Sequence, residues 1–239
     1  MSNITDLGYK RKIYKCITFV DSMEKIPLQA RLKREIHRKI AYAQDLVVKG
    51  VYSVFDKAVL RGGTAIWRCY SGKRFSEDLD FYFPNDLKKI EVLFENLKKA
   101  GFKIIKKKVL ENSIYSELEV DRVSIRLEAT FQKISGVICD YEISDGNIIS
   151  IYSLTPESFL IEKSNAYLKR FKIRDLWDVF FLLKIVDNPQ SIKEIGNLIK
   201  NYKKPIDEED LKTILLEGII PSADEMIDYI RRKWENKYI

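Results

Sequence analysis

The sequence predicts an α+β fold, in which a mixed or antiparallel sheet with flanking helices precedes a helical C-terminal domain. Helical periodicity marks residues 28–50 and 86–100. Residues 102–152 are instead rich in Ile, Val, Tyr and Phe with little helical period, so several antiparallel strands are expected there. The remainder is again helical. We therefore expect an α+β domain with an N-terminal helix over residues 1–150, and a helical domain over residues 151–239.

The first predicted elements are a helix and a strand-turn-helix unit. Apolar residues recur every three to four positions over residues 28–50, and Gly50 stands where a C-cap belongs. Residues 58–72 combine a short apolar run, a glycine pair and a second apolar run that ends near Gly72, which predicts a strand, a tight turn and a short helix.

The next elements are bounded by turn residues. Asp78 to Phe83 is predicted as a strand, and Pro84 is expected to end it. The helix over residues 86–100 is followed directly by Gly101, and Asp145–Gly146 is a hairpin signal within the strand-rich segment.

The helical C-terminal part starts at Thr155, an N-cap followed by Pro156 at the first helical position. Asn188–Pro189 interrupts the helices, and Ser222 with Glu225 forms a capping box for the last one. Neither a repeat nor a low-complexity linker separates the two parts, so we expect them to pack closely around a cleft.

Composition limits the class of protein. The chain has 239 residues, 46% of them hydrophobic, which suffices for a buried core. It carries 42 Lys and Arg against 35 Asp and Glu, a net charge of +7. This balance suits a polyanionic partner such as nucleic acid, and equally a solvated surface rich in lysine.

Cysteine, histidine and apolar runs exclude several kinds of site. Cys16, Cys69 and Cys139 are too few and too far apart for a disulfide framework or a zinc site. His37, the one histidine, excludes a Ser-His-Asp triad and is expected at a solvated helix position. The chain has neither a membrane-spanning apolar run nor a signal-peptide pattern, so we expect a soluble, cytoplasmic protein without membrane contact.

Two carboxylates form the first candidate site. In a strand, Asp78 and Asp80 project from the same face, with Cα atoms roughly 6–7 Å apart. Such a pair can hold one or two divalent cations, and hard oxygen ligands suit Mg²⁺. The alternative interpretation is an ordinary strand edge with alternating polar and apolar residues.

A glycine turn favours the metal interpretation. Gly62 and Gly63 allow a ligand to approach the backbone, and Thr64 opens a helix whose N–H groups and dipole attract an anion. A phosphate-binding turn this close to an acidic strand describes a triphosphate held against a metal. Arg74 and Ser76, in between, can bind phosphate or be solvated loop residues.

A third carboxylate is expected from the two-metal mechanism, and Glu128 is our candidate. It shares a strand face with Arg126, opposite an apolar face that marks a central strand. Glu117, Glu119 and Asp121 are its rivals in a more polar stretch.

The helical domain offers Lys163 and Arg170 on one helix face, followed by Arg174, Asp175 and Asp178 at the next helix start. The two aspartates can cap that helix and pair with Arg174, a structural role. Alternatively, Lys163 faces the cleft and contacts nucleotide phosphates.

Three blocks of the sequence carry a family resemblance: residues 59–66 (Val-Leu-Arg-Gly-Gly-Thr-Ala-Ile), residues 74–81 (Arg-Phe-Ser-Glu-Asp-Leu-Asp-Phe) and residues 162–178. In these blocks the chain resembles the nucleotidyltransferase toxins of the AbiEii/AbiGii group, which includes the MenT toxins. Arg61 and Ile66 stand where the family usually has Lys and Leu. The resemblance implies a polymerase-beta-like minimal nucleotidyltransferase fold with a helical C-terminal part. It also implies a nucleoside triphosphate substrate, dependence on Mg²⁺ (or Mn²⁺), a tRNA acceptor as in several relatives, and a cognate antitoxin.

Carried over by residue, the family pattern implies metal ligands at Asp78 and Asp80 and nucleotide or phosphate contacts at Ser76 and Lys163. It also makes one or both of Asp175 and Asp178 active-site residues.

The expected reaction is in-line attack of an acceptor hydroxyl on the α-phosphate, with pyrophosphate leaving toward Gly63 and Thr64. Basic residues can track an RNA backbone: Lys106 to Lys108, Lys169, Arg170, Lys172 and Arg231 to Lys233. Two alternatives stay open: a nucleotidyltransferase with a small-molecule or protein acceptor, and a non-catalytic nucleotide- or RNA-binding regulator.

Overall fold

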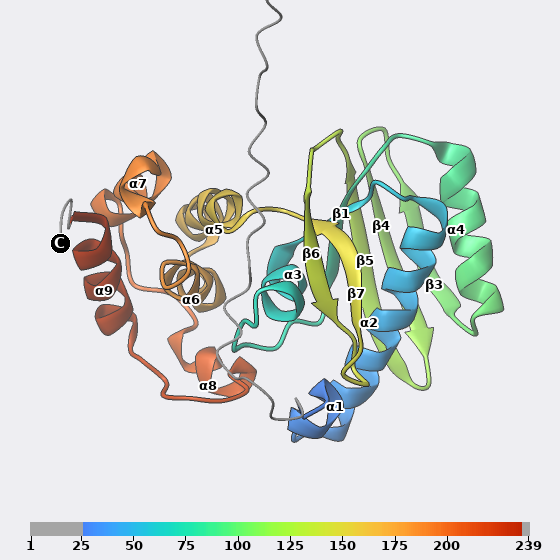
Figure 1. Cartoon of the computed structure of the whole chain (residues 1–239), viewed down its shortest axis with the longest axis horizontal. Helices are drawn as coiled ribbons and strands as arrows, with labels where there is room; N and C mark the ends of the chain where they lie inside the picture. The colour runs from blue at the N-terminus through green and yellow to red at the C-terminus, as the bar shows by residue number, and fades with distance from the viewer. Residues whose placement is uncertain (1–25, 236–239) are drawn as a thin grey trace, which may run out of the picture.

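A mixed sheet organises the first two thirds of the chain. The computed structural model describes residues 26–235, and within them seven strands form one sheet of order β3-β4-β5-β2-β1-β7-β6 (Figure 1). Cys16 lies outside the described residues. The strands are β1 (Val59–Arg61), β2 (Leu79–Phe83), β3 (Lys103–Val109), β4 (Ser113–Val120), β5 (Val123–Phe131), β6 (Val137–Glu142) and β7 (Ile148–Ser153).

The helices gather on two sides of this sheet. Figure 1 shows α2 and α4 on one side and α5, α6, α7 and α9 on the other. The bounds are α1 (Leu28–Arg31), α2 (Glu35–Val54), α3 (Gly62–Cys69), α4 (Leu87–Lys99), α5 (Pro156–Arg170), α6 (Ile173–Leu182), α7 (Lys193–Lys200), α8 (Leu211–Ile214) and α9 (Ala223–Glu235), with 3-10 turns η1 (Pro189–Ser191) and η2 (Glu208–Asp210).

The α+β class is confirmed, and the sheet is mixed. β3, β4 and β5 are antiparallel neighbours, as are β6 and β7. The central strand β2 runs parallel to β5 and antiparallel to β1, and β1 runs parallel to β7. The expected boundary at residue 151 falls within β7, so the sheet continues to Ser153 before the helices begin.

The face of β2 that carries Phe81 and Phe83 forms the core. Phe55, at the end of α2, stacks on Phe83 with ring centroids 4.7 Å apart, and Tyr52 contacts Phe81 edge-on. Residues two apart along a strand share a face, so Asp80 and Tyr82 point to the opposite side, toward α5. β2 therefore anchors in the core on one face and presents polar groups on the other.

Gly50 does not end the first long helix, contrary to the sequence prediction. α2 continues to Val54, and a Cβ on Gly50 would lie 3.2 Å from Leu97 of α4. The glycine is thus used for close helix packing. The predicted helix is also interrupted, because α1 ends at Arg31 and α2 begins at Glu35.

His37 lies on a helix as predicted, but it is only partly exposed. Its ring stacks on Phe75 with centroids 3.9 Å apart, and burial together with nearby Arg34 lowers its pKa. Phe75 belongs to the loop that leads to Asp78, so this stack ties α2 to that loop.

The predicted N-terminal caps at Thr155 and Ser222 are confirmed. Thr155 Oγ1 accepts a hydrogen bond from the Ser158 amide at the start of α5. Ser222 and Glu225 bind each other's backbone N–H groups before α9. At α6 the cap comes from elsewhere, because Asp207 accepts the Ile173 N–H in place of Asp175 or Asp178.

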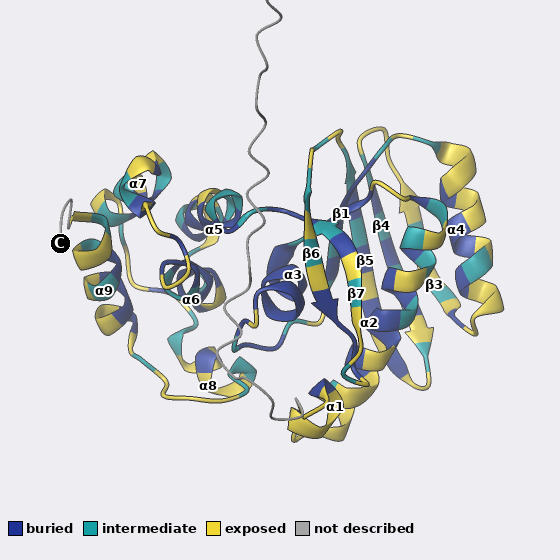
Figure 2. Cartoon of the chain, viewed as in Figure 1, coloured by how far each residue is buried: buried dark blue, intermediate teal, exposed yellow. Residues whose placement is uncertain are grey.

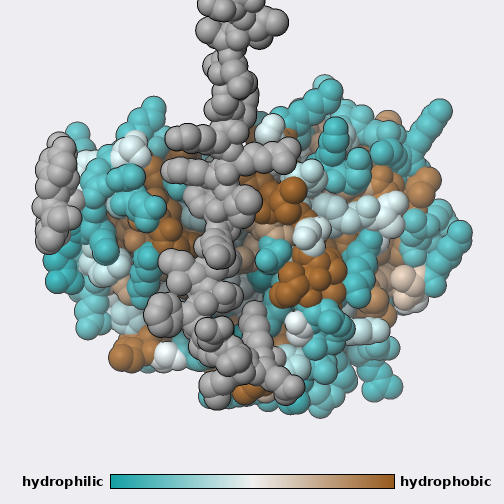
Figure 3. All heavy atoms as spheres, in the orientation of Figure 1, coloured by the Kyte–Doolittle hydropathy of each residue, from teal (hydrophilic) through white to brown (hydrophobic). Residues whose placement is uncertain are grey.

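Burial follows the layers, as Figure 2 shows for α3 and the central strands. All eight residues of α3 are buried. On the face in Figure 3, hydrophilic side chains cover most of the rim, and apolar side chains gather near the edge strand β6, which exposes Ile138. Among residues 26–235, every helix is too short or too polar to cross a bilayer.

Candidate active site

Five side chains form a row across the polar face of the sheet. Arg61 pairs with Asp80, Asp80 with Glu128, Glu128 with Tyr115 and Tyr115 with Lys108, over five successive strands. Directly paired residues share a sheet face, so these side chains stand side by side. Glu128, the candidate third carboxylate, therefore lies beside Asp80.

Asp78 lies two residues before Asp80, on the same face of the sheet. It immediately precedes β2, and its carboxylate lies 3.1 Å from Arg126 Nη2, while Arg126 Nη1 lies 3.9 Å from Glu128. Glu117, one of the rivals of Glu128, pairs instead with Arg126 and accepts a hydrogen bond from Ser124. Asp78, Asp80 and Glu128 thus form one acidic group with Arg126 beside it.

The glycine turn lies directly against this group. Gly62 has a φ of +74°, and a Cβ there would lie 2.2 Å from Asp80 Oδ2. A Cβ on Gly63 would lie 2.7 Å from Ser76 Oγ. The start of α3, where the first helical N–H groups have no partner within the helix, therefore meets the carboxylate of Asp80 and the hydroxyl of Ser76.

The loop before β2 is fixed by partly buried hydrogen bonds. Thr64 Oγ1 donates to the Asp78 carbonyl at 2.5 Å. Gln44 Nε2 donates to the carbonyls of Ser76 and Glu77 at 2.8 and 3.0 Å. The Thr64 hydroxyl is therefore engaged by the backbone of Asp78, and the phosphate contact expected of this residue is one of its N–H group.

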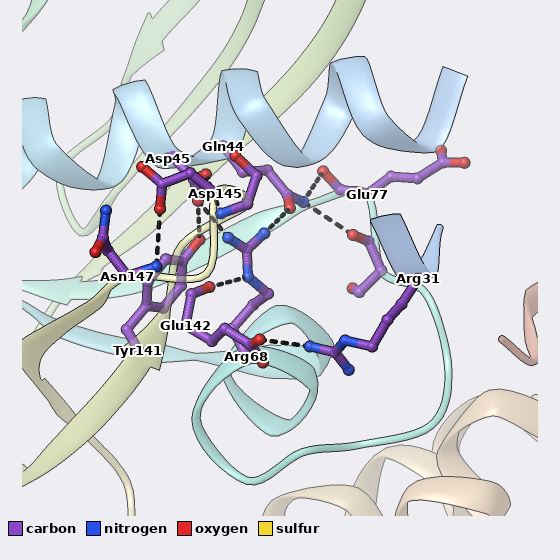
Figure 4. A network of polar contacts seen from close by, with 11 residues as sticks. Arg31, Gln44, Asp45, Arg68, Glu77, Tyr141, Glu142, Asp145 and Asn147 are labelled. Atoms are coloured by element: carbon purple, nitrogen blue, oxygen red, sulfur yellow. Dashed lines mark hydrogen bonds and ion pairs between the residues drawn. The ribbon is translucent and has the colours of Figure 1, made fainter. Parts of the chain in front are cut away.

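Gln44 is held in turn by a buried network centred on Arg68 and Asp45 (Figure 4). Arg68 contacts Gln44, forms an ion pair with Asp45 and donates to the Glu142 carbonyl at 2.7 Å. Asp45 also accepts the Ser144 N–H at 2.8 Å. Sequence reasoning missed this support. The signal was present, because Gln44 and Asp45 stand among the apolar positions of the predicted helix.

Two of the three carboxylates have raised pKa values, mainly because they are removed from water. Burial raises the pKa of Asp80, against the opposing charges of Lys163 and Arg61. Burial and the neighbouring Asp80 raise the pKa of Glu128. A cation at this site would relieve both effects, because it stabilises the ionised forms.

Lys163 lies at the same face, inside a buried charge cluster. Its ammonium is 2.7 Å from Asp178 and 3.7 Å from Asp175. Arg74 binds both oxygens of Asp178, and Arg170 binds both oxygens of Asp175. The two aspartates thus hold basic side chains and do not pair with Arg174.

Arg74 is buried beside the glycine turn. It is 4% exposed, its Nε and Nη2 bind Asp178 at 2.6 Å each, and Nη1 donates to the Phe75 carbonyl. Three of its five N–H donors are engaged in this way, so the guanidinium joins the loop to α6.

The basic residues expected to track RNA divide by sheet face. Lys107 turns toward α4, where it binds Glu91 and lies over Phe94. Lys106 and Lys108 are exposed on the other face, which also carries Glu128. Arg170, Lys172 and Arg231 are engaged in ion pairs, with Asp175, Asp207 and Asp228.

Residues 26–235 contain no group of three or more His, Cys, Asp or Glu side chains arranged as a metal site on their own. If a metal binds at Asp78, Asp80 and Glu128, these carboxylates would supply only part of its ligands. A phosphate-bearing substrate would have to supply others.

Comparisons with solved structures identify the fold. JHP933 from Helicobacter pylori has a TM-score of 0.58 at 20% identity, covering 84% of this chain and 91% of that one. MenT4, a nucleotidyltransferase toxin from Mycobacterium tuberculosis, has a TM-score of 0.59 at 17% identity, with 87% of each chain covered. These likenesses confirm the nucleotidyltransferase fold. A search of curated proteins found no match.

A family model described as the nucleotidyl transferase AbiEii toxin of type IV toxin-antitoxin systems matches residues 51–235. The matched range is more than half of the chain and contains the glycine turn, the acidic group and the Lys163 cluster. This chain is therefore a nucleotidyltransferase that belongs to the AbiEii toxin family.

Proposed function

We propose that this enzyme transfers a nucleoside monophosphate from a nucleoside triphosphate (NTP) to a hydroxyl group of RNA in the cytoplasm, with tRNA as the expected acceptor and Mg²⁺ or Mn²⁺ required. The observation that carries the proposal is the position of Asp80. Its carboxylate lies against Gly62 at the start of α3 and beside Glu128 on the next strand. A phosphate-binding helix start and an acidic group therefore share one site.

Asp78 and Asp80 are the proposed metal ligands, with Glu128 as the third carboxylate. Mg²⁺ is commonly held by one or two carboxylates together with substrate phosphates, so this donor set fits it. When bound, the metal neutralises the charge that develops on the transferred phosphoryl group.

The chain's own residues account for the remaining steps. The acceptor hydroxyl forms the new P–O bond at the α-phosphorus while the bond to pyrophosphate breaks. Glu128 accepts the hydroxyl proton, a role that its raised pKa suits. The N–H groups of Gly63 and Thr64, the Ser76 hydroxyl and the Lys163 ammonium bind the triphosphate and the departing pyrophosphate.

Asp175 and Asp178 are proposed as positioning residues. Both are buried, and their carboxylates fix Lys163 and Arg74. They act on the substrate through Lys163.

The RNA acceptor is supported by the row of residues that continues from Glu128 to β3. Tyr115 lies between Glu128 and Lys108 in the sheet register, and Lys106 Nζ lies 5.0 Å from the centre of the Tyr115 ring. Exposed lysines beside an aromatic ring suit a single-stranded RNA end, through phosphate contacts and base stacking.

The test is transfer of label from each of the four α-labelled NTPs to total tRNA in the presence of Mg²⁺. We expect labelled RNA with at least one NTP, and none after EDTA. Label on a small molecule or a protein in place of RNA would contradict the acceptor.

A double variant tests whether Lys106 and Lys108 bind RNA. Lys106→Gln with Lys108→Gln should weaken tRNA binding and lower its salt slope by about 1.4, about 0.7 for each lost phosphate contact. The matched control is Lys88→Gln with Lys99→Gln, which removes two exposed lysines of α4 on the other side of the sheet. Equal effects of the two pairs would contradict the assignment.

We also propose a cognate antitoxin, since the family model describes toxins of toxin-antitoxin systems. Co-expression of the neighbouring gene should restore growth of cells that express this enzyme. Growth that stays arrested would contradict that gene's role.

A further inference from the structure

Two arginines flank the Gly62–Gly63 turn, and their surroundings differ. Arg74 is 4% exposed, and three of its five N–H donors bind Asp178 and a backbone carbonyl. Arg61 precedes the turn, and its side chain is 30% exposed. Its Nε is buried without a hydrogen-bond partner among the described residues. A buried donor without a partner is uncommon, and a bound anion is one of the conditions that explain it.

The Arg61 guanidinium is held at a defined place on the active-site face. It lies over the Tyr82 ring, with Cζ 4.5 Å from the ring centre, and Nη2 is 3.5 Å from Glu162. Tyr82 donates its hydroxyl to the other oxygen of Glu162 at 2.7 Å. Burial and this hydrogen bond raise the pKa of Tyr82 to about 12, so its hydroxyl remains a donor near neutral pH.

This place is next to the reacting groups. Arg61 is the register partner of Asp80, and it is the residue before Gly62. Its charge acts to lower the pKa of Asp80, as does the charge of Lys163. Arg61 and Lys163 therefore act on Asp80 from two different elements, β1 and α5.

We propose that Arg61, and not Arg74, is the arginine that binds the phosphates of the NTP, and that Tyr82 and Glu162 hold its guanidinium ready. The inference rests on the proposed function. A planar guanidinium donates two parallel hydrogen bonds to a phosphate, which a lysine in its place cannot do. Glu162 keeps the group near Asp80, and the 3.5 Å separation leaves donors for the substrate.

The experiment measures equilibrium binding of three probes in Mg²⁺: the NTP that wild type binds best, its uncharged nucleoside, and inorganic tripolyphosphate. Arg61→Gln should weaken the NTP and tripolyphosphate by about 10-fold or more, the effect of losing a charge-assisted contact. Nucleoside binding and the thermal unfolding midpoint should stay as in wild type. Arg38→Gln, an exposed arginine of α2, is the matched control and should change nothing.

Arg61→Lys keeps the charge and loses the planar fork, so its NTP affinity should lie between wild type and Arg61→Gln. This variant decides the matter if Arg61→Gln does not fold. Unchanged NTP affinity in either variant, or equal loss of NTP and nucleoside, would overturn the role of Arg61. If wild type binds no NTP, the proposed function is overturned as well. If wild type binds NTP and the Arg61 variants bind it equally well, only the role of Arg61 is overturned.

Discussion

Arg74 binds both carboxylate oxygens of Asp178 at 2.6 Å, across 104 residues of sequence. The pair joins the loop before β2 to α6, so it fixes the sheet relative to the C-terminal helices. The same carboxylate holds Lys163 at 2.7 Å. One buried aspartate therefore links the position of Lys163, the lysine proposed to bind the triphosphate, to the position of the acidic strand.

Removal of this carboxylate should destabilise the fold. Asp178→Asn leaves Arg74 and Lys163 without their main partner, and breaking a buried pair costs about 3–5 kcal/mol. Urea unfolding measures the loss. The control is Asp224→Asn, which breaks an exposed pair with Lys204 and should leave the unfolding curve unchanged. Similar unfolding curves for the two variants would mean that the buried pair stabilises the fold no more than the exposed pair does.

Acid should weaken the same contact. Burial acts to raise the pKa of Asp178, but the charges of Arg74 and Lys163 outweigh burial and hold the pKa below its ordinary value of 3.8. The carboxylate thus stabilises the fold at pH values above 3.8, and this contribution is lost as pH falls through the lowered pKa. Unfolding free energy, measured at a series of acid pH values, should fall less steeply in Asp178→Asn. Parallel curves for the two proteins would rule out this contribution.

Gly62→Ala should abolish activity through Asp80. An alanine Cβ would lie 2.2 Å from Asp80 Oδ2, so the carboxylate must move away from the start of α3. Gly101→Ala provides the matched control, because Gly101 has a similar positive φ of +94° with nothing within 4 Å. Both variants carry a backbone strain of about 1–2 kcal/mol. Nucleotide transfer should drop about 100-fold or more in Gly62→Ala alone, and comparable rates in the two variants would argue against the placement of Asp80.

Thr64→Val should reduce turnover by releasing the loop at Asp78. The substitution keeps the side-chain shape and leaves the partly buried Asp78 carbonyl without its 2.5 Å hydrogen bond, at a cost of about 0.5–1.5 kcal/mol. Thr213→Val removes a comparable hydroxyl that donates to a carbonyl on the exposed surface. We expect lower stability and a lower kcat only in Thr64→Val, as measured by urea unfolding and pyrophosphate release. An unchanged kcat would show that the hydroxyl does not position Asp78.

Asp78 and Asp80 alternate with the apolar residues Leu79 and Phe81, and this alternation was sufficient to predict two carboxylates on one strand face. The glycine pair predicted the turn beside it, and Glu128 was identified from the apolar face of its own strand. These features depend on residues close in sequence, where strand and helix periods apply.

Contacts between distant residues could not be predicted in this way. The partner of Arg74 lies 104 residues away, so the sequence offered a phosphate contact or a solvated loop position for this arginine and not its ion pair with Asp178. The face of Lys107 depends on a register shift in β3 between Ile104 and Lys106. Gly50 has the position of a helix end, but its use for packing depends on Leu97 of another helix.

The central claim is that the acidic group beside the glycine turn performs metal-dependent nucleotidyl transfer. The most direct measurement is pyrophosphate release with Mg²⁺, NTP and total tRNA by wild type, Asp80→Asn and Asp140→Asn. Asp140 is an exposed strand aspartate of β6 and serves as the control. We predict full activity in Asp140→Asn, and loss of activity in Asp80→Asn without a lower unfolding midpoint. Wild-type rates in a folded Asp80→Asn variant, or in wild type treated with EDTA, would contradict the claim.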